Sequence, residues 1–254
     1  MPFLDHLEEL RWRIVKSLAA VGIAFSGSFW LMWNYLEPVA EFVIEPIRPM
    51  LPDGALVYTH PMGLFTILMQ VAGVLALVVA SPVVGYQVWA FLAPALTGRE
   101  RKIIVPVLAF AAILFLVGVA LAVLVFVPMT VKLMMGLQVK SLVPLITARE
   151  YFGFIFLISL AFGGIFEMPI LVLVLTALGL VTPTQLAKGR RWAAAISLVA
   201  AMIITPGDFV IATLMLWAPI YGLYEFSIVV SWFVHRARKK REAGAESIGD
   251  GAES

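Results

Sequence analysis

Long apolar runs constrain this sequence more than any other feature. Runs of about 20 residues recur along the chain, enough for an α-helix to cross a hydrocarbon core about 30 Å thick. The 254 residues are 62% hydrophobic and 13% charged, and the mean hydropathy is +0.99. Soluble domains carry about 25% charged residues. The sequence therefore predicts an integral membrane protein.

Six runs are predicted to cross the membrane: 14–36, 63–92, 103–129, 151–180, 192–205 and 209–234. Each must be helical, because backbone groups in lipid need partners within their own segment and no run alternates like a barrel strand. The predicted fold class is all-α, a polytopic bundle of six transmembrane helices forming one domain over residues 1–235. Run 192–205 is short and Pro219 interrupts run 209–234. We therefore expect short fifth and sixth helices and a locally thinned membrane beside them.

The distribution of basic residues predicts the orientation of the chain. Of the 18 Lys and Arg residues, 14 lie at the amino terminus up to Lys16, after the second run, after the fourth or after the sixth, and the exceptions are Arg48, Lys132, Lys140 and Arg149. By the positive-inside rule, both termini are expected in the cytoplasm. No small-residue cleavage site follows the first run, which is therefore expected to be a retained anchor. Residues 236–254 are basic, then small and acidic, and predict a disordered tail.

Prolines and capping patterns shape the predicted connections. Segment 37–61 predicts a rigid extracytoplasmic cap with a turn at Pro46, because it contains several prolines: Pro38, Pro46, Pro49, Pro52 and Pro61. The sequence TPGD at 205–208 predicts a tight turn built on Pro206 and Asp208. TARE at 147–150 and TPTQ at 182–185 are capping-box patterns, and each predicts the start of a helix.

The segment HLEELRWR at 6–13 places a dense set of charges directly before the first apolar run. An apolar stripe at helical spacing, Leu4, Leu7, Leu10 and Ile14, predicts an amphipathic helix on the membrane surface. Its charged residues would then face water or headgroups: Glu8, Glu9, Arg11 and Arg13. Glu9 has two interpretations, an i,i+4 ion pair with Arg13 or a binding group for an external cation.

The loop after the second run repeats this chemistry. In YQVWAFLAPALTGRERK, residues 86–102, Glu100 stands between Arg99 and Arg101. One interpretation is a capping box in which Glu100 bonds the amide of Thr97. The other is that Glu9 and Glu100 converge at the cytoplasmic surface on a ligand with two guanidinium groups, whose planar donor fork matches a carboxylate.

Four motifs in order resemble the TatC subunits of twin-arginine protein translocases: HLEELRWR, PVVGYQVWAFLAPALTGRER at 82–101, FEMP at 166–169 and TPGD. The resemblance covers about residues 6–235. It implies a glove-shaped bundle of six spans in a bacterial or archaeal cytoplasmic (inner) membrane. It also implies a receptor for the twin-arginine signal peptides of folded proteins. Such a receptor organises single-span TatA-type and TatB-type subunits in a hetero-oligomer, for export driven by the proton-motive force.

The resemblance implies a signal-peptide site made of Glu9, Glu100, Phe91, Arg11 and Arg101. The two carboxylates would contact the arginine pair of the signal peptide. The sequence departs from the family pattern at Gly207, where a second proline is common, and at Ala212, where many members carry glutamine. The first departure puts the stiffness of the last extracytoplasmic turn in question, and the second weakens the expectation of a polar partner contact.

Glu167 lies inside the fourth run, two residues before Pro169. A charge at the bilayer centre is unfavourable by about 2.5–3.5 kcal/mol on insertion scales, so such residues face a cavity or stay protonated. One interpretation is a polar contact for a partner helix, as the resemblance to the family's intramembrane glutamate implies. The other is a protonated carboxyl group bonded to backbone that Pro169 leaves free.

The sequence predicts no metal site, no cofactor and no enzymatic activity. Cysteine is absent, the three histidines are scattered, and no HExxH, GxSxG or P-loop motif occurs. A net charge of +2 offers nucleic acid no electrostatic footprint. Most tryptophans predict an interfacial belt near span ends: Trp12, Trp30, Trp33, Trp89, Trp192 and Trp232. The alternative function is a proton-coupled secondary transporter using Glu167, although no internal repeat supports it.

Overall fold

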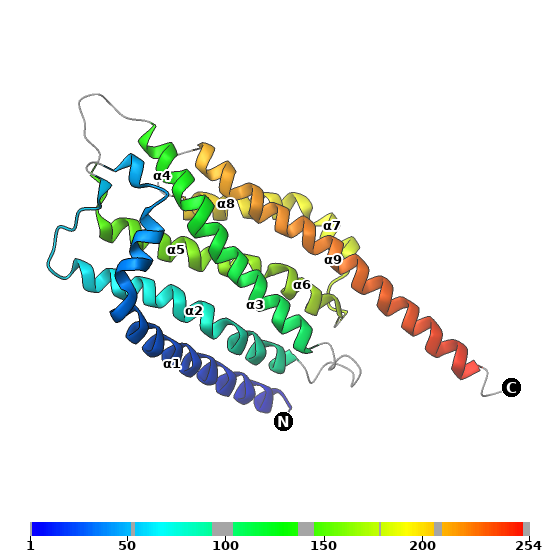
Figure 1. Cartoon of the computed structure of the whole chain (residues 1–254). Coiled ribbons are helices and arrows are strands. Elements are labelled where there is room, and N and C mark those ends of the chain that lie inside the picture. The colour runs from blue at the N-terminus through cyan, green and yellow to red at the C-terminus, as the bar shows by residue number, and fades with distance from the viewer. Residues whose placement is uncertain are drawn as a thin grey trace. The chain divides into compact units, whose positions relative to one another are not determined.

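Helices make up the described part of the chain. A computed structural model describes residues 2–51, 54–92, 104–136, 145–177, 179–205 and 210–250 (Figure 1). Within these ranges every element is helical, apart from one isolated parallel bridge between Val57 and Thr147. The predicted all-α class is confirmed. The chain divides into two compact units, Met1–Gly164 and Ile165–Ser254, which are described separately.

Within its described residues, the first unit holds five α-helices, one 3-10 turn and one π-helical turn. They are α1 (Pro2–Ile44), the 3-10 turn η1 (Arg48–Met50), α2 (Gly63–Leu92), α3 (Ile104–Leu121), the π-helical turn η5 (Ala122–Phe126), α4 (Val127–Met135) and α5 (Ala148–Phe166), whose last two residues belong to the second unit. The second unit continues with α6 (Met168–Ala177), α7 (Pro183–Lys188), α8 (Arg190–Ile204) and α9 (Val210–Asp250).

Among the described residues, five helical segments are long and apolar enough to cross a membrane: Leu7–Ile44, Gly63–Phe91, Pro106–Met135, Ala148–Ala177 and Val210–Arg236. The chain is therefore a multi-pass membrane protein. α8 has 15 residues and corresponds to the short segment predicted at 192–205. At 1.5 Å per residue it is about 22 Å long, less than the hydrocarbon thickness. The total of six crossings remains a prediction.

α1 is one element, whereas the sequence predicted a surface helix followed by a span and a proline-rich cap. A single residue inside it, Tyr35, has non-helical dihedral angles (φ −124°, ψ 20°). Pro38 explains the bend, because it has no N–H to donate and its ring crowds the carbonyl group of Asn34. The helix then continues to Ile44, and Pro46 lies in the turn that follows at 45–47.

α1 and α2 run side by side in the first unit (Figure 1). A buried cluster of Met32, Leu68 and Ala72 joins them, with Phe25 and Phe29 of α1 packed against it. Ala72 is followed at four-residue intervals by two further buried alanines, Ala76 and Ala80. Small residues at this spacing let membrane helices approach closely, where van der Waals packing drives association.

A serine compensates for the proline inside α2. Pro82 has no N–H, so the carbonyl group of Val78 loses its usual helical partner. The hydroxyl group of Ser81 donates a hydrogen bond to that carbonyl at 2.9 Å. An unpaired backbone group in lipid is unfavourable by several kcal/mol, and neighbouring hydroxyl groups commonly satisfy it. α2 therefore stays continuous over the range predicted from the sequence.

α9 is the element on which α6, α7 and α8 pack in the second unit. The hydroxyl groups of Thr176 and Ser231, both fully buried, are hydrogen-bonded at 2.8 Å and join α6 to α9. The indole Nε1 of Trp217 donates to the backbone oxygen of Ala194 at 3.1 Å and joins α8 to α9. Polar bonds between helices each contribute about 0.6 kcal/mol on average in a membrane protein.

α9 is longer than the sequence predicted. It contains 41 residues, passes through Pro219 as a single helix and extends to Asp250. The expectation of a short sixth helix is wrong, and the helix covers much of the tail that composition predicted to be disordered. Residues 236–250 contain Ala, Arg, Lys and Glu in quantity, and these residues have high helix propensity.

We predict that Gly163→Ala lowers the thermal stability of the purified protein. A Cβ atom at Gly163 would lie 2.6 Å from Cε2 of Phe115, so the ring must move. Overpacking of this kind is unfavourable by about 1–3 kcal/mol. Gly27→Ala is the matched control, because no atom lies within 4 Å of its added Cβ. Thermal unfolding in detergent measures the difference, and equal midpoints for the two variants would show that the Phe115 contact is unimportant.

Candidate functional site

The charged amino-terminal turns of α1 contain an ion pair. Arg13 donates from Nε to Oε1 of Glu9 at 3.0 Å, and its terminal guanidinium nitrogen contacts the same oxygen. The side chains are 21% exposed for Arg13 and 34% exposed for Glu9. Ser17 donates to the backbone oxygen of Arg13 at 2.9 Å. The i,i+4 interpretation of Glu9 is therefore realised, although exposed pairs of this spacing contribute only about 0.3–0.5 kcal/mol.

The residues around this pair are largely exposed. Glu8 and Arg11 are exposed, as are Leu7 and Ile14 of the predicted apolar stripe. Trp12 is also exposed, at 57%. Exposed apolar side chains next to charges that reach water suit a helix end at a membrane boundary, although Leu10 of the stripe is half-buried.

The carboxyl end of α2 supplies two aromatic side chains. Phe91 is half-buried. Trp89 is only 5% exposed, and its indole N–H has no acceptor among the described residues. The assignment of Trp89 to an interfacial belt is therefore wrong. The position of a tryptophan near the end of a span does not show whether its ring packs against neighbouring helices or faces the lipid headgroups.

Glu100 and Arg101 lie outside the described residues, as do Pro206, Gly207 and Asp208. The convergence of Glu9 with Glu100 therefore stays a prediction. Ala212, the second departure from the family pattern, is 1% exposed within the second unit. A small side chain at this position serves helix packing.

Glu167 is the single turn residue between α5 and α6. Its backbone oxygen accepts hydrogen bonds from the amides of Ile170 at 3.1 Å and Leu171 at 3.0 Å. The helix predicted over 151–180 is broken here, because buried Pro169 lacks an N–H and crowds the carbonyl group of Ile165. The half-buried carboxyl group of Glu167 makes no hydrogen bond to any described backbone group. This favours the first interpretation, a polar group available to a partner.

No three His, Asp or Glu side chains of the described ranges stand close enough to hold a metal ion. The site predicted from Glu9, Glu100, Phe91, Arg11 and Arg101 stays a prediction, and the structure describes Glu9, Arg11 and Phe91 of it.

Comparison with known proteins establishes the family. The family profile described as "Sec-independent protein translocase protein (TatC)" matches residues 5–219. The chain belongs to the TatC family. The resemblance inferred from the four motifs is confirmed, and the alternative of a proton-coupled transporter loses its support. TatC is a protein translocase component, and a translocase of this kind implies partner subunits.

Individual TatC proteins match over nearly their whole length. TatCd of Bacillus subtilis (strain 168) is 34% identical over 242 residues, covering 95% of this chain and 96% of the relative. TatC of Aquifex aeolicus (strain VF5) is 33% identical over 243 residues, covering 94% and 98%. A crystal structure described as "Twin Arginine Translocase Receptor- TatC" matches with a TM-score of 0.75 at 32% identity, covering 90% of this chain and 99% of that one.

We predict that export tolerates Glu167→Gln better than Glu167→Leu or Glu167→Lys. The side chain stands at a helix break inside an apolar segment, where a hydrogen-bonding group is useful and a full charge is unfavourable by about 2.5–3.5 kcal/mol. The measurement is export of a twin-arginine precursor, normalised to the amount of each variant in the membrane. Glu150→Leu, which changes an exposed acid at the start of α5, is the control. Equal export by all three Glu167 variants would show that this side chain is irrelevant.

Proposed function

We propose that this chain is the receptor subunit of a twin-arginine protein translocase. It binds the twin-arginine signal peptides of folded proteins at the cytoplasmic face of a bacterial or archaeal cytoplasmic membrane. It then organises single-span TatA-type and TatB-type subunits in a hetero-oligomer for transport driven by the proton-motive force. Both termini are cytoplasmic, and the subunit performs no covalent chemistry. The family membership and the likeness to a structure described as a receptor support this proposal.

The observation that carries the proposal is the contact between Glu9 and Arg13. It shows the carboxylate of Glu9 binding a guanidinium group through two nitrogens of the same fork. Glu9 is 34% exposed, so an arginine from outside can reach it. An incoming signal-peptide arginine would replace Arg13 at Glu9 and preserve the charge-assisted hydrogen bonds.

This exchange of arginines implies that other contacts must supply the free energy of binding. Replacing one arginine by another at Glu9 changes the free energy little, because the broken and the formed contacts are alike. Net affinity must therefore come from a second carboxylate, which we assign to Glu100, and from apolar contacts near Phe91. Two carboxylates also distinguish arginine from lysine, because the ammonium group of lysine is a point charge and cannot form the same planar pair of bonds.

We predict that Glu9→Gln and Arg13→Gln change signal-peptide affinity in opposite directions. Glu9→Gln removes the carboxylate and leaves the charge of Arg13 to repel the incoming arginine, so it should weaken binding by roughly fivefold, the equivalent of about 1 kcal/mol. Arg13→Gln removes the internal competitor for Glu9 and should leave binding equal or tighter. The measurement is binding of a fluorescent twin-arginine peptide to the purified protein, with Glu8→Gln as a control that changes an exposed neighbouring acid. Equal losses in both variants would mean that the pair only stabilises α1.

We also predict that charge reversal at both acids, Glu9→Lys with Glu100→Lys, abolishes crosslinking to a twin-arginine precursor. Two added cations repel the arginine pair, while membrane insertion depends on the apolar spans and should be retained. Site-specific crosslinking from the 86–102 loop measures the contact, and a precursor with paired lysines is the control. Undiminished crosslinking by the double variant would return both acids to structural roles within the chain.

A further inference from the structure

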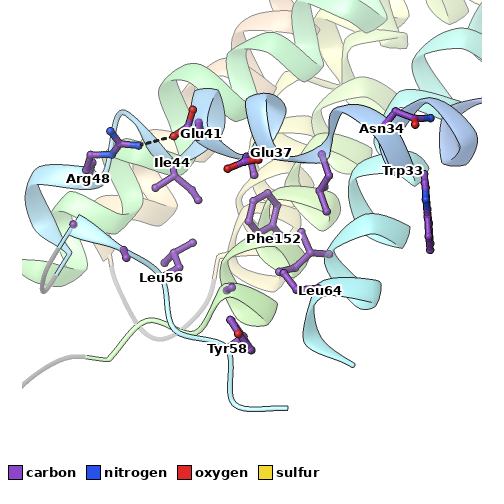
Figure 2. Close-up of a pocket in the computed structure, with 16 residues that line it drawn as sticks. Trp33, Asn34, Glu37, Glu41, Ile44, Arg48, Leu56, Tyr58, Leu64 and Phe152 are labelled. Carbon is purple, nitrogen blue, oxygen red and sulfur yellow. Dashed lines mark ion pairs between the residues drawn. The ribbon is translucent and has the colours of Figure 1, made fainter. Parts of the chain in front are cut away.

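A cavity of about 600 Å³ lies in the first unit at the end of α1 distant from Glu9 (Figure 2). Its walls come from the last turns of α1, the η1 turn, the segment 54–58 and the first turns of α2 and α5. Ligand-binding cavities have volumes of about 300–1,000 Å³, apolar walls and a few polar groups. This cavity has those properties and is distinct from the proposed signal-peptide site.

Three charged side chains line the cavity: Glu37, Glu41 and Arg48. A guanidinium nitrogen of Arg48 lies 3.8 Å from Oε1 of Glu41, as the dashed line in Figure 2 shows, and the other lies 3.1 Å from Oε2 of Glu45. Glu37, one turn earlier on α1, forms no ion pair or hydrogen bond with the described part of the chain. The lining therefore carries a net negative charge and offers a carboxylate to an external cation.

The remaining wall is apolar and aromatic. Phe152 of α5 is 2% exposed and forms part of this wall. Leu56 of the segment 54–58 and Leu64 of α2 also line the cavity (Figure 2). Two exposed aromatic residues, Trp33 and Tyr58, also line the cavity. Tryptophan and tyrosine concentrate where a bilayer meets water, and exposed residues of both types at this opening fit a position at headgroup depth.

Long-range hydrogen bonds hold these walls together. The hydroxyl group of buried Tyr151 donates to the backbone oxygen of Val43 at 2.9 Å and ties α5 to the end of α1. The amide of Ala148 donates to the backbone oxygen of Val57 at 2.8 Å and ties α5 to the segment 54–58. The cavity is thus formed before any ligand arrives, which lowers the entropic penalty of binding.

We propose that this cavity binds the headgroup of an aminophospholipid, a zwitterionic lipid with a primary ammonium group. The ammonium group binds Glu37, the phosphate lies toward Arg48, and the first acyl carbons pack on the apolar wall. The net negative lining disfavours a purely anionic lipid. A lipid is the occupant that the site selects, because the opening stands at headgroup depth in a membrane-spanning chain and combines both charges with an apolar wall.

The test is native mass spectrometry of the detergent-solubilised chain titrated with three lipids of identical acyl chains. Phosphatidylethanolamine has a primary ammonium group, phosphatidylcholine a methylated one, and phosphatidylglycerol none. The ethanolamine lipid should bind roughly tenfold more tightly than the other two, as expected when a charge-assisted hydrogen bond is gained. Equal binding of all three lipids would overturn the proposal.

Variants locate the binding. Glu37→Gln should abolish the preference for the ethanolamine lipid, and Ala55→Trp should weaken its binding by filling the cavity from an exposed position without changing a charge. Glu150→Gln removes an exposed carboxylate from the first turn of α5, outside the lining, and should bind like the parent chain. A full preference retained in Glu37→Gln would overturn the assignment of the ammonium group to Glu37.

A crosslink identifies the occupant in a membrane. A photoreactive residue replaces Leu56 in chain reconstituted with its partner subunits into vesicles of phosphatidylethanolamine and phosphatidylglycerol. An adduct with the mass of the ethanolamine lipid supports the proposal. An adduct with only a partner subunit would overturn the proposal and would place that subunit, not a lipid, at the cavity.

Discussion

The satisfaction of backbone hydrogen bonds in lipid is the constraint on which this structure depends. No water is present in the hydrocarbon to replace a missing partner, so each proline inside a span needs a local solution. At Pro82 the hydroxyl group of Ser81 supplies the lost bond, and the helix continues. Before Pro38 the helix bends at Tyr35, and at Pro169 it breaks and leaves Glu167 in the turn. Two of these solutions create the features that matter most, because the break places half-buried Glu167 within a span and the bend precedes the cavity beside Glu37.

Much of the fold follows from the sequence because apolar length and local capping are local properties. The second predicted span coincides with α2, and Thr182 and Gln185 form the complete capping box expected at the start of α7. Thr147 likewise caps the amide of Glu150 at 3.3 Å. Whether a proline breaks a helix is harder to predict, because it depends on the groups that neighbour it in the fold. Pro219 was expected to interrupt the last span, yet α9 passes through it.

Some features of the site follow from local sequence, and others depend on residues that are distant in the chain. The pair of Glu9 with Arg13 follows from a spacing of four residues, and four short motifs identify the family. The burial of Trp89 depends on neighbours that no local pattern specifies. The cavity beside Glu37 requires Tyr151 to reach Val43, which precedes it by 108 residues in the chain. The prolines of segment 37–61 predict a rigid cap, but they do not show that α5 is the helix that packs against it.

The continuity of α9 has a structural consequence. At 1.5 Å per residue, its 41 residues form a rod about 60 Å long, considerably longer than the hydrocarbon is thick. Three contacts fasten the neighbouring helices to its apolar half: Trp217 donates to the backbone oxygen of Ala194, Tyr224 donates to that of Leu186, and Ser231 shares a hydrogen bond with Thr176. The four helices therefore form one packed group, and the carboxyl end of α9 extends beyond the hydrocarbon as a continuation of that group.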